Sequence, residues 1–105
     1  MQRIFLENSS NQEFDITLDQ TRYRVNIREG NSQIMLASVN INGEDVINGI
    51  RCLASTPLLP YRYTERGNFI FLTQNDELPY WEKFGQSQRL LYLTVEEVEA
   101  LRNGV

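Results

Sequence analysis

Residues 14–27, with the sequence Phe-Asp-Ile-Thr-Leu-Asp-Gln-Thr-Arg-Tyr-Arg-Val-Asn-Ile, contain the pattern that decides the fold. Apolar and polar residues alternate through 14–18 and alternate again through 23–27. A period of two puts alternate side chains on opposite faces of a β-strand, so each run has one face suited to a core and one suited to water. We therefore predict two antiparallel strands joined as a hairpin through Asp19-Gln20-Thr21.

The polar face of this hairpin carries opposite charges on its two strands. Acidic residues lie on the first strand (Glu13 and Asp15) and arginines on the second (Arg22, Arg24 and Arg28). Opposite charges that face each other across antiparallel strands attract. We expect cross-strand ion pairs that help to hold the register.

Two further amphipathic strands, 34–41 and 46–53, flank Asn42-Gly43. Both central residues of a type I′ turn need positive φ, which Asn and Gly tolerate best, so this dipeptide predicts a second hairpin. Gly49 lies within the returning strand, where a glycine indicates a bulge or a close backbone approach. Shorter strands are predicted at 4–6, 69–73 and 89–93.

Residues 95–103 predict a short C-terminal helix. Thr94 can cap its first turn, and Glu97 follows three residues later, which is the capping-box spacing. Val98 and Leu101 are three residues apart and would pack one face of the helix on the sheet. The whole pattern predicts a mainly β fold, either a small antiparallel β-barrel or a sandwich-like meander, with a short C-terminal helix.

The composition suits one compact domain. The chain has 105 residues, 41% of them hydrophobic, which is enough for one continuous core and predicts a single domain over residues 1–105. The formal charge is −4, without blocks of one sign, and this opposes nucleic-acid binding. All basic residues except Lys83 are arginine, which suits protein interfaces because guanidinium groups bond in a plane and stack on aromatic rings.

The residue types that catalysis and metal binding use most are scarce. The chain has no histidine, and Cys52 is its only cysteine, so no intrachain disulfide can form and no zinc site of the usual kind is expected. Cys52 lies in an apolar run, where we expect a buried, unreactive thiol. We predict no metal, no cofactor and no enzymatic activity.

Carboxylate pairs at Asp76-Glu77 and Glu44-Asp45 keep one catalytic alternative open, a small hydrolase that uses two acids. Both pairs adjoin turns, where solvated acidic residues are common. Such a hydrolase would need a pocket in which two acids converge with raised pKa values.

The apolar segments are too short for a membrane protein. The first six residues are partly apolar, but the chain becomes polar at Glu7, well before the length that a signal peptide needs. No other run approaches the length of a membrane span. We expect a protein that is made in a cytoplasm and has no membrane partner.

Two aromatic segments are candidates for contacts. Residues 58–63 follow Pro57 and contain Pro60, and the missing amide hydrogens predict an extended connection rather than a regular central strand. Their aromatic side chains could pack on the core, stack on single-stranded nucleic acid as in an OB-like barrel, or dock on a protein. Residues 79–85 hold three more aromatic side chains, which either close one end of the β structure or face a partner.

We favour a protein interface, because Tyr, Trp and Arg contribute most of the binding energy at interfaces and the net charge opposes the nucleic-acid alternative. Salt-dependent binding to an oligonucleotide would support that alternative instead. The predicted interface residues are Tyr61, Arg62, Tyr63 and Trp81.

A set of short motifs, in this order and spacing, resembles the phage baseplate plug family. The motifs are Gln12-x-Phe14, Thr17-Leu18-Asp19, Arg22-Tyr23, Gly49-Ile50, Leu58-Leu59-Pro60-Tyr61-Arg62-Tyr63, Gly67-Asn68-Phe69 and Leu91-Tyr92-Leu93. The resemblance extends from about Ile4 to Leu101. The family consists of small proteins encoded among the tail genes of contractile-tailed phages, including a cyanophage with a simple baseplate.

The resemblance implies a component of the virion, located in the tail baseplate near the central hub and made in the cytoplasm of the bacterial host. It implies no enzymatic activity, and the family has no catalytic residues to transfer. The expected partners are other baseplate and tail hub proteins, with several symmetric copies in the virion, as ring-like assemblies require.

Overall fold

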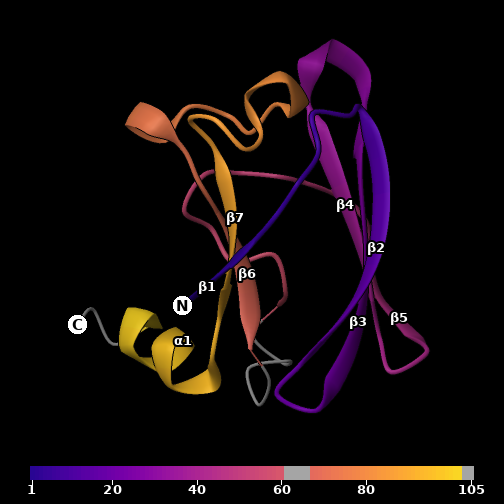
Figure 1. Cartoon of the computed structure of the whole chain (residues 1–105), viewed down its shortest axis with the longest axis vertical. Helices are drawn as coiled ribbons and strands as arrows, with labels where there is room; N and C mark the ends of the chain where they lie inside the picture. The colour runs from indigo at the N-terminus through magenta and orange to yellow at the C-terminus, as the bar shows by residue number, and fades with distance from the viewer. Residues whose placement is uncertain (61–66, 103–105) are drawn as a thin grey trace.

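The computed structural model describes residues 1–60 and 67–102. Two antiparallel sheets pack face to face, and α1 (Val95–Arg102) lies beside the smaller one (Figure 1). The smaller sheet, in the order β1-β7-β6, contains β1 (Gln2–Ile4), β7 (Arg89–Leu93) and β6 (Asn68–Leu72). The larger sheet, in chain order, contains β2 (Asn11–Leu18), β3 (Thr21–Glu29), β4 (Met35–Ile41) and β5 (Glu44–Arg51). Of the two predicted architectures, the fold is therefore the sandwich-like meander.

The predicted first hairpin is confirmed as β2 and β3. Leu18 pairs with Thr21, so the turn contains only Asp19 and Gln20, with φ values of 50° and 63°. The turn is one residue shorter than expected, because both residues adopt the positive φ that a two-residue hairpin needs. The apolar side chains of β3 all enter the core, as the alternation predicts.

The second hairpin, β4 and β5, has the predicted turn, with φ of 51° at Asn42 and 90° at Gly43. The register between the strands shifts near Val39. Gly49 has φ of 68°, and a Cβ atom there would lie 2.9 Å from a guanidinium nitrogen of Arg28. Both predicted explanations of Gly49, an irregular strand and a close approach, therefore apply.

The smaller sheet is apolar on both faces, which explains the continuous apolar run in β6. Phe69 and Phe71 face the larger sheet, whereas Ile70 packs with Val98 of α1 on the opposite face. The ring of Phe69 meets Tyr23 and Tyr92 edge to face, with centroids 5.2 and 5.4 Å away. Aromatic packing thus joins the two sheets, and α1 covers the outer face of the smaller one.

The extended connection after β5 runs beside β6. The amide groups of Ser55 and Leu58 donate to the carbonyl groups of Phe71 and Phe69, at 2.8 and 2.9 Å. The side chain of Asn68 continues this pairing, since it bonds to both the amide and the carbonyl of Leu59 at 2.9 and 3.0 Å. As predicted, residues 58–60 form no regular strand, but the chain bends at Leu58 and Leu59, and residues 61–63 lie outside the described part of the chain.

The capping box at the start of α1 is confirmed. Glu97 accepts from the amide of Thr94 at 3.0 Å, and the hydroxyl of Thr94 accepts from the amide of Glu97 at 3.3 Å. The other carboxylate oxygen of Glu97 lies 2.6 Å from the amino group of Met1, which ties β1 to the helix. Val98 is buried on the sheet, as predicted. None of the helices in the described residues is long and apolar enough to cross a lipid bilayer.

The predicted bounds of the first strand need adjustment. The first strand ends at Ile4 rather than Leu6, because the chain leaves β7 there and crosses toward the larger sheet. Cys52 is buried as expected, and desolvation raises the pKa of its thiol to about 12.

Candidate protein-interaction site

Of the predicted interface residues, Tyr61, Arg62 and Tyr63 lie outside the residues that the structure describes. Trp81 begins a short 3-10 helix, Trp81–Lys83, in the aromatic loop between β6 and β7. It is half-buried and packs against the main core.

The aromatic loop closes one end of the sandwich. Phe84 is fully buried and stacks on Phe71 with ring centroids 5.7 Å apart. Gln88, also fully buried, accepts from the amide of Tyr80 at 2.7 Å and donates to the carbonyl of Leu78 at 3.0 Å. The loop is thus fixed by side chains from its own ends and closes this end of the sandwich, while its predicted contact with a partner stays a prediction.

The segment between β1 and β2 also holds this loop. The amide nitrogen of the Asn8 side chain donates to three carbonyl groups of the loop, those of Trp81, Glu82 and Phe84, at 3.2, 3.1 and 2.9 Å. These bonds place the short helix directly beside the chain that links the two sheets.

Trp81 lies far from Gly67, which is the first described residue after Tyr61, Arg62 and Tyr63. The hydroxyl of Tyr92 bonds to Asp19, in the turn before β3, and also contacts the backbone of Gly67. Gly67 therefore lies at the end of the sandwich where β3 begins. The aromatic loop lies at the opposite end of β3, where Glu29 accepts from its tyrosine at 2.8 Å. A strand of this length spans about 26 Å. Gly67 and Trp81 therefore mark opposite ends of the molecule.

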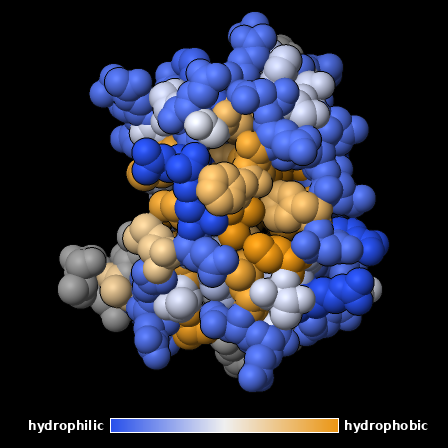
Figure 2. Space-filling view, in the orientation of Figure 1, coloured by the Kyte–Doolittle hydropathy of each residue, from blue (hydrophilic) through white to orange (hydrophobic). Residues whose placement is uncertain are grey.

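An apolar surface lies along the side of the sandwich where the chain passes from β1 to β2. Both strands are at the edge of their sheets. The exposed or half-buried apolar side chains here form the β1–β2 edge: Phe5, Leu6, Phe14 and Ile16. Figure 2 shows apolar atoms open to solvent at the centre of the molecule, between the polar borders of the two layers.

Phe5 is the most exposed large apolar residue in the described ranges, at 82%. The guanidinium group of Arg3 lies over its ring, 5.0 Å from the centroid. Within the part of the chain that the structure describes, Arg3 has no carboxylate partner. A single exposed apolar residue is ordinary, but Phe5 lies on the segment that joins two edge strands, and three other apolar side chains on this segment and β2 are only half-buried.

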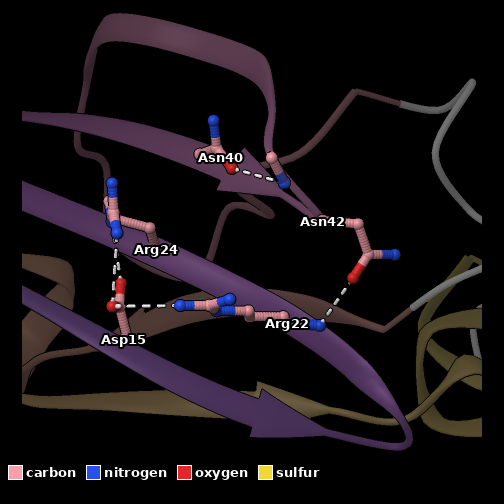
Figure 3. A pocket seen from close by; sticks show the side chains of 6 residues that line it. Asp15, Arg22, Arg24, Asn40 and Asn42 are labelled. Carbon is pink, nitrogen blue, oxygen red and sulfur yellow. Dashed lines mark hydrogen bonds and ion pairs between the residues drawn. The ribbon is translucent and has the colours of Figure 1, made fainter.

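The outer face of the larger sheet carries a polar hollow of about 430 Å³ (Figure 3). We call it the arginine hollow, and it is lined by Asp15, Arg22, Arg24, Asn40, Asn42 and Gly43. Arg24 holds Asp15 with two bonds, at 2.9 and 3.4 Å, which confirms the expected cross-strand ion pair. This hydrogen bond from Arg24 lowers the pKa of Asp15 below its usual value.

The carboxylate pairs do not have the features that a two-acid hydrolase needs. Glu77 bonds to Lys83 at 2.8 Å and to Gln88 at 3.0 Å, and these hydrogen bonds lower its pKa. A carboxylic acid that acts as a general acid needs a raised pKa instead. Glu44 and Asp45 are exposed at the start of β5. Among the residues that the structure describes, no group of three or more acidic or cysteine side chains is placed to hold a metal ion.

The β1–β2 edge was not predicted, although the sequence contains a signal for it. In the predicted strand 4–6, Ile4 and Leu6 would share the core face, so Phe5 between them must point outward. An aromatic side chain on the solvent face of an edge strand indicates a contact surface. For the arginine hollow, the sequence predicted only the ion pairs between β2 and β3. The hollow itself also needs Asn40, Asn42 and Gly43 of the second hairpin, whose contacts with β3 were not predicted.

The sequence matches the model of a known family. The family model described as the cyanophage baseplate Pam3 plug gp18 matches residues 1–96, which include β1 to β7 and the first two residues of α1. The comparison with curated proteins gives no match. Because the family model matches nearly the whole chain, this protein belongs to the cyanophage baseplate plug family, whose members are structural proteins of the phage tail baseplate.

Proposed function

We propose that this protein is a non-catalytic joining component of the tail baseplate, which connects the tail hub to the surrounding baseplate proteins through protein contacts. Family membership supports its place in the baseplate. The observation that carries the proposed mode of action is the exposure of Phe5, which we infer to form an apolar patch with Leu6, Phe14 and Ile16 beside two edge strands. Such a patch gains free energy when a partner covers it, at roughly 25 cal/mol per Å² of apolar surface.

The partner at the β1–β2 edge should combine apolar and acidic side chains. Apolar groups would cover Phe5 and the neighbouring Leu6, Phe14 and Ile16, which already pack on the core from one side. An acidic group would pair with Arg3, which has only an aromatic neighbour for its charge in the described residues. Strand β2 presents Phe14 and Ile16, and the three bonds of Asn8 hold the segment that carries Phe5, so little conformational entropy is lost on binding.

Two further contacts are proposed on the basis of residue type. Trp81 is half-buried beside Asn8, so it can extend the β1–β2 edge toward the aromatic loop. Tyr61, Arg62 and Tyr63 lie between Pro60 and Gly67 in the sequence and form the second predicted contact, because stiffened segments with Tyr and Arg bind at low entropic cost. Two contact regions suit a component that joins two neighbours.

The assembly implies repetition. A baseplate is built around a tail axis, so we propose several symmetric copies in each virion, each using the same surfaces. We also propose synthesis in the cytoplasm of the bacterial host, followed by incorporation into the tail.

The test is co-purification of the protein with baseplate proteins expressed from the neighbouring tail genes. Phe5→Ser should lose most of this association and leave the free energy of unfolding within about 0.5 kcal/mol of wild type, because Phe5 is mostly exposed. Leu72→Ser is the matched control, since Leu72 is 44% exposed on β6, the opposite edge of the smaller sheet. It should keep the association.

Two results would contradict the proposal. If wild-type protein retains no baseplate protein, the joining function is wrong. If Phe5→Ser associates as well as Leu72→Ser does, the protein joins its partners through another surface than the β1–β2 edge.

A further inference from the structure

The three arginines on the outer face of β3 have different surroundings. Arg28 is half-buried and donates to Asn26 and Ser38 at 2.8 and 2.9 Å, so it belongs to the polar network of the sheet. Arg24 is bound to Asp15 by two hydrogen bonds. The remaining arginine, Arg22, has one charged neighbour in the described chain, a carboxylate oxygen of Asp15 at 3.9 Å.

A separation of 3.9 Å is too long for a hydrogen bond, so no acceptor among the described residues occupies the side-chain donors of Arg22. The Arg22 side chain is 68% exposed and extends along the floor of the arginine hollow (Figure 3). Two guanidinium groups and one carboxylate line the hollow, and the other lining residues are neutral. The residues that line the hollow therefore carry a net charge of about +1, within a protein whose formal charge is −4.

The backbone around the hollow is already fixed. The amide of Arg22 donates to the side chain of Asn42 at 2.9 Å, and the amide of Asn42 donates to the carbonyl of Arg22 at 2.8 Å. The amide of Gly43 donates to the side chain of Asn40 at 2.9 Å. These bonds tie the start of β3 to the turn between β4 and β5, so a ligand would meet a rigid site.

We propose that the arginine hollow binds one carboxylate side chain presented by another protein, with Arg22 as its main contact. That the other protein is a baseplate component rests on the proposed function. The chemistry of the site does not depend on it. Asp15 already shows that the hollow accepts a carboxylate in two-bond geometry. A second carboxylate would neutralise the remaining positive charge.

The surroundings favour a single carboxylate over a nucleic-acid backbone. Asp45 accepts from Asn40 at the edge of the hollow, at 3.0 Å, and Glu44 precedes it. Glu13 lies close enough to act on the charge of Arg24. A chain of phosphates would carry several negative charges past these acids and be repelled more strongly than the single negative charge of one carboxylate on a protein loop.

The test is a titration of the isotope-labelled full chain with a blocked pentapeptide that has one central glutamate, followed by NMR. The signals of the Arg22 side chain and of the Asn42 and Gly43 amides should shift with the glutamate peptide and not with the matched glutamine peptide. Arg22→Ala should weaken binding about tenfold or more, which corresponds to one lost charged hydrogen-bonding contact. Arg89→Ala, which removes an exposed arginine of β7, should leave binding unchanged.

The Asp15→Asn variant distinguishes two interpretations of the hollow: a binding site for a carboxylate, or an ion pair that only stabilises the sheet. It removes the carboxylate that occupies Arg24 and raises the local charge, so the glutamate peptide should bind about three- to tenfold more tightly. Equal shifts with the glutamine peptide, equal losses in the Arg22 and Arg89 variants, or weaker binding to Asp15→Asn would each overturn the proposal. So would tighter binding of oligothymidylate than of the glutamate peptide at physiological salt. None of these outcomes affects the co-purification test of the joining function.

Discussion

The hydroxyl group of Tyr92 on β7 donates a 2.9 Å hydrogen bond to the carboxylate of Asp19, in the turn between β2 and β3. The bond crosses from the smaller sheet to the larger one at the end of the sandwich. Tyr92 is 3% exposed, and burial is the first cause that raises the pKa of its hydroxyl, so the group stays protonated and remains a donor.

Tyr92→Phe should therefore lower the free energy of unfolding by about 1–2 kcal/mol, since the acceptor is charged but partly solvated. Urea denaturation measures the change. Tyr80→Phe is the matched control, because its hydroxyl bonds to the exposed Glu29 and should contribute less. A Tyr92→Phe protein as stable as the control would mean that this bond does not hold the sheets together.

Gly67→Ala should destabilise the protein by about 1–3 kcal/mol through overpacking. A Cβ atom at this position would collide with the Tyr92 side chain and the backbone of Leu93. Gly30→Ala is the control, because there the nearest atom, 3.0 Å away, belongs to the flexible side chain of Leu36. Thermal melts of both variants decide the matter, and equal midpoints would contradict the close approach at Gly67.

Thr94→Ala should lower the free energy of unfolding by about 1 kcal/mol, because the hydroxyl of Thr94 caps α1 through the amide of Glu97. Thr94→Ser, which retains a hydroxyl at the same place, should recover most of the loss. The measurement is a urea melt of both variants. An unchanged midpoint for Thr94→Ala would show that the cap contributes nothing to the isolated protein.

Stability should fall in acid partly through Glu77, whose pKa is lowered by the hydrogen bond from Lys83 and then by that from Gln88. A folded-state pKa below the unfolded value means that this contribution is fully present above about pH 4.3 and is lost as the pH falls through the folded pKa. Glu77→Gln should therefore flatten the decline of unfolding free energy between about pH 5 and pH 3. An unchanged slope would contradict the assignment.

The sequence predicts the strands well where the apolar pattern is strong. The alternation in β3 specifies its buried face, and Asn42-Gly43 specifies the second turn, because only a few residue types tolerate the required φ. The continuous apolar run of β6 is harder to interpret from sequence, since it needs both a sheet partner and α1 to cover its two faces.

The polar contacts that position the loops could not be predicted. Asn8 and the loop that it holds are more than 70 residues apart in the chain, as the separations of 73 to 76 residues show. Gln88 can be fully buried because its side-chain amide bonds to the backbone amide of Tyr80 and the backbone carbonyl of Leu78 in the loop. Composition does not reveal this role. The proposed interaction surface was missed for a related reason: Phe5 is significant only when the strands before and after it are known to be edge strands.

The central claim, that the β1–β2 edge joins this protein to its neighbours, is tested most directly by photo-crosslinking in assembled baseplates. A photoreactive phenylalanine analogue replaces Phe5 in one sample and the exposed Glu99 of α1 in a control. The account predicts that irradiation links position 5 to another baseplate protein at high yield, with far less crosslinking from position 99. Incorporation of both variants into baseplates without any crosslink from position 5 would contradict it.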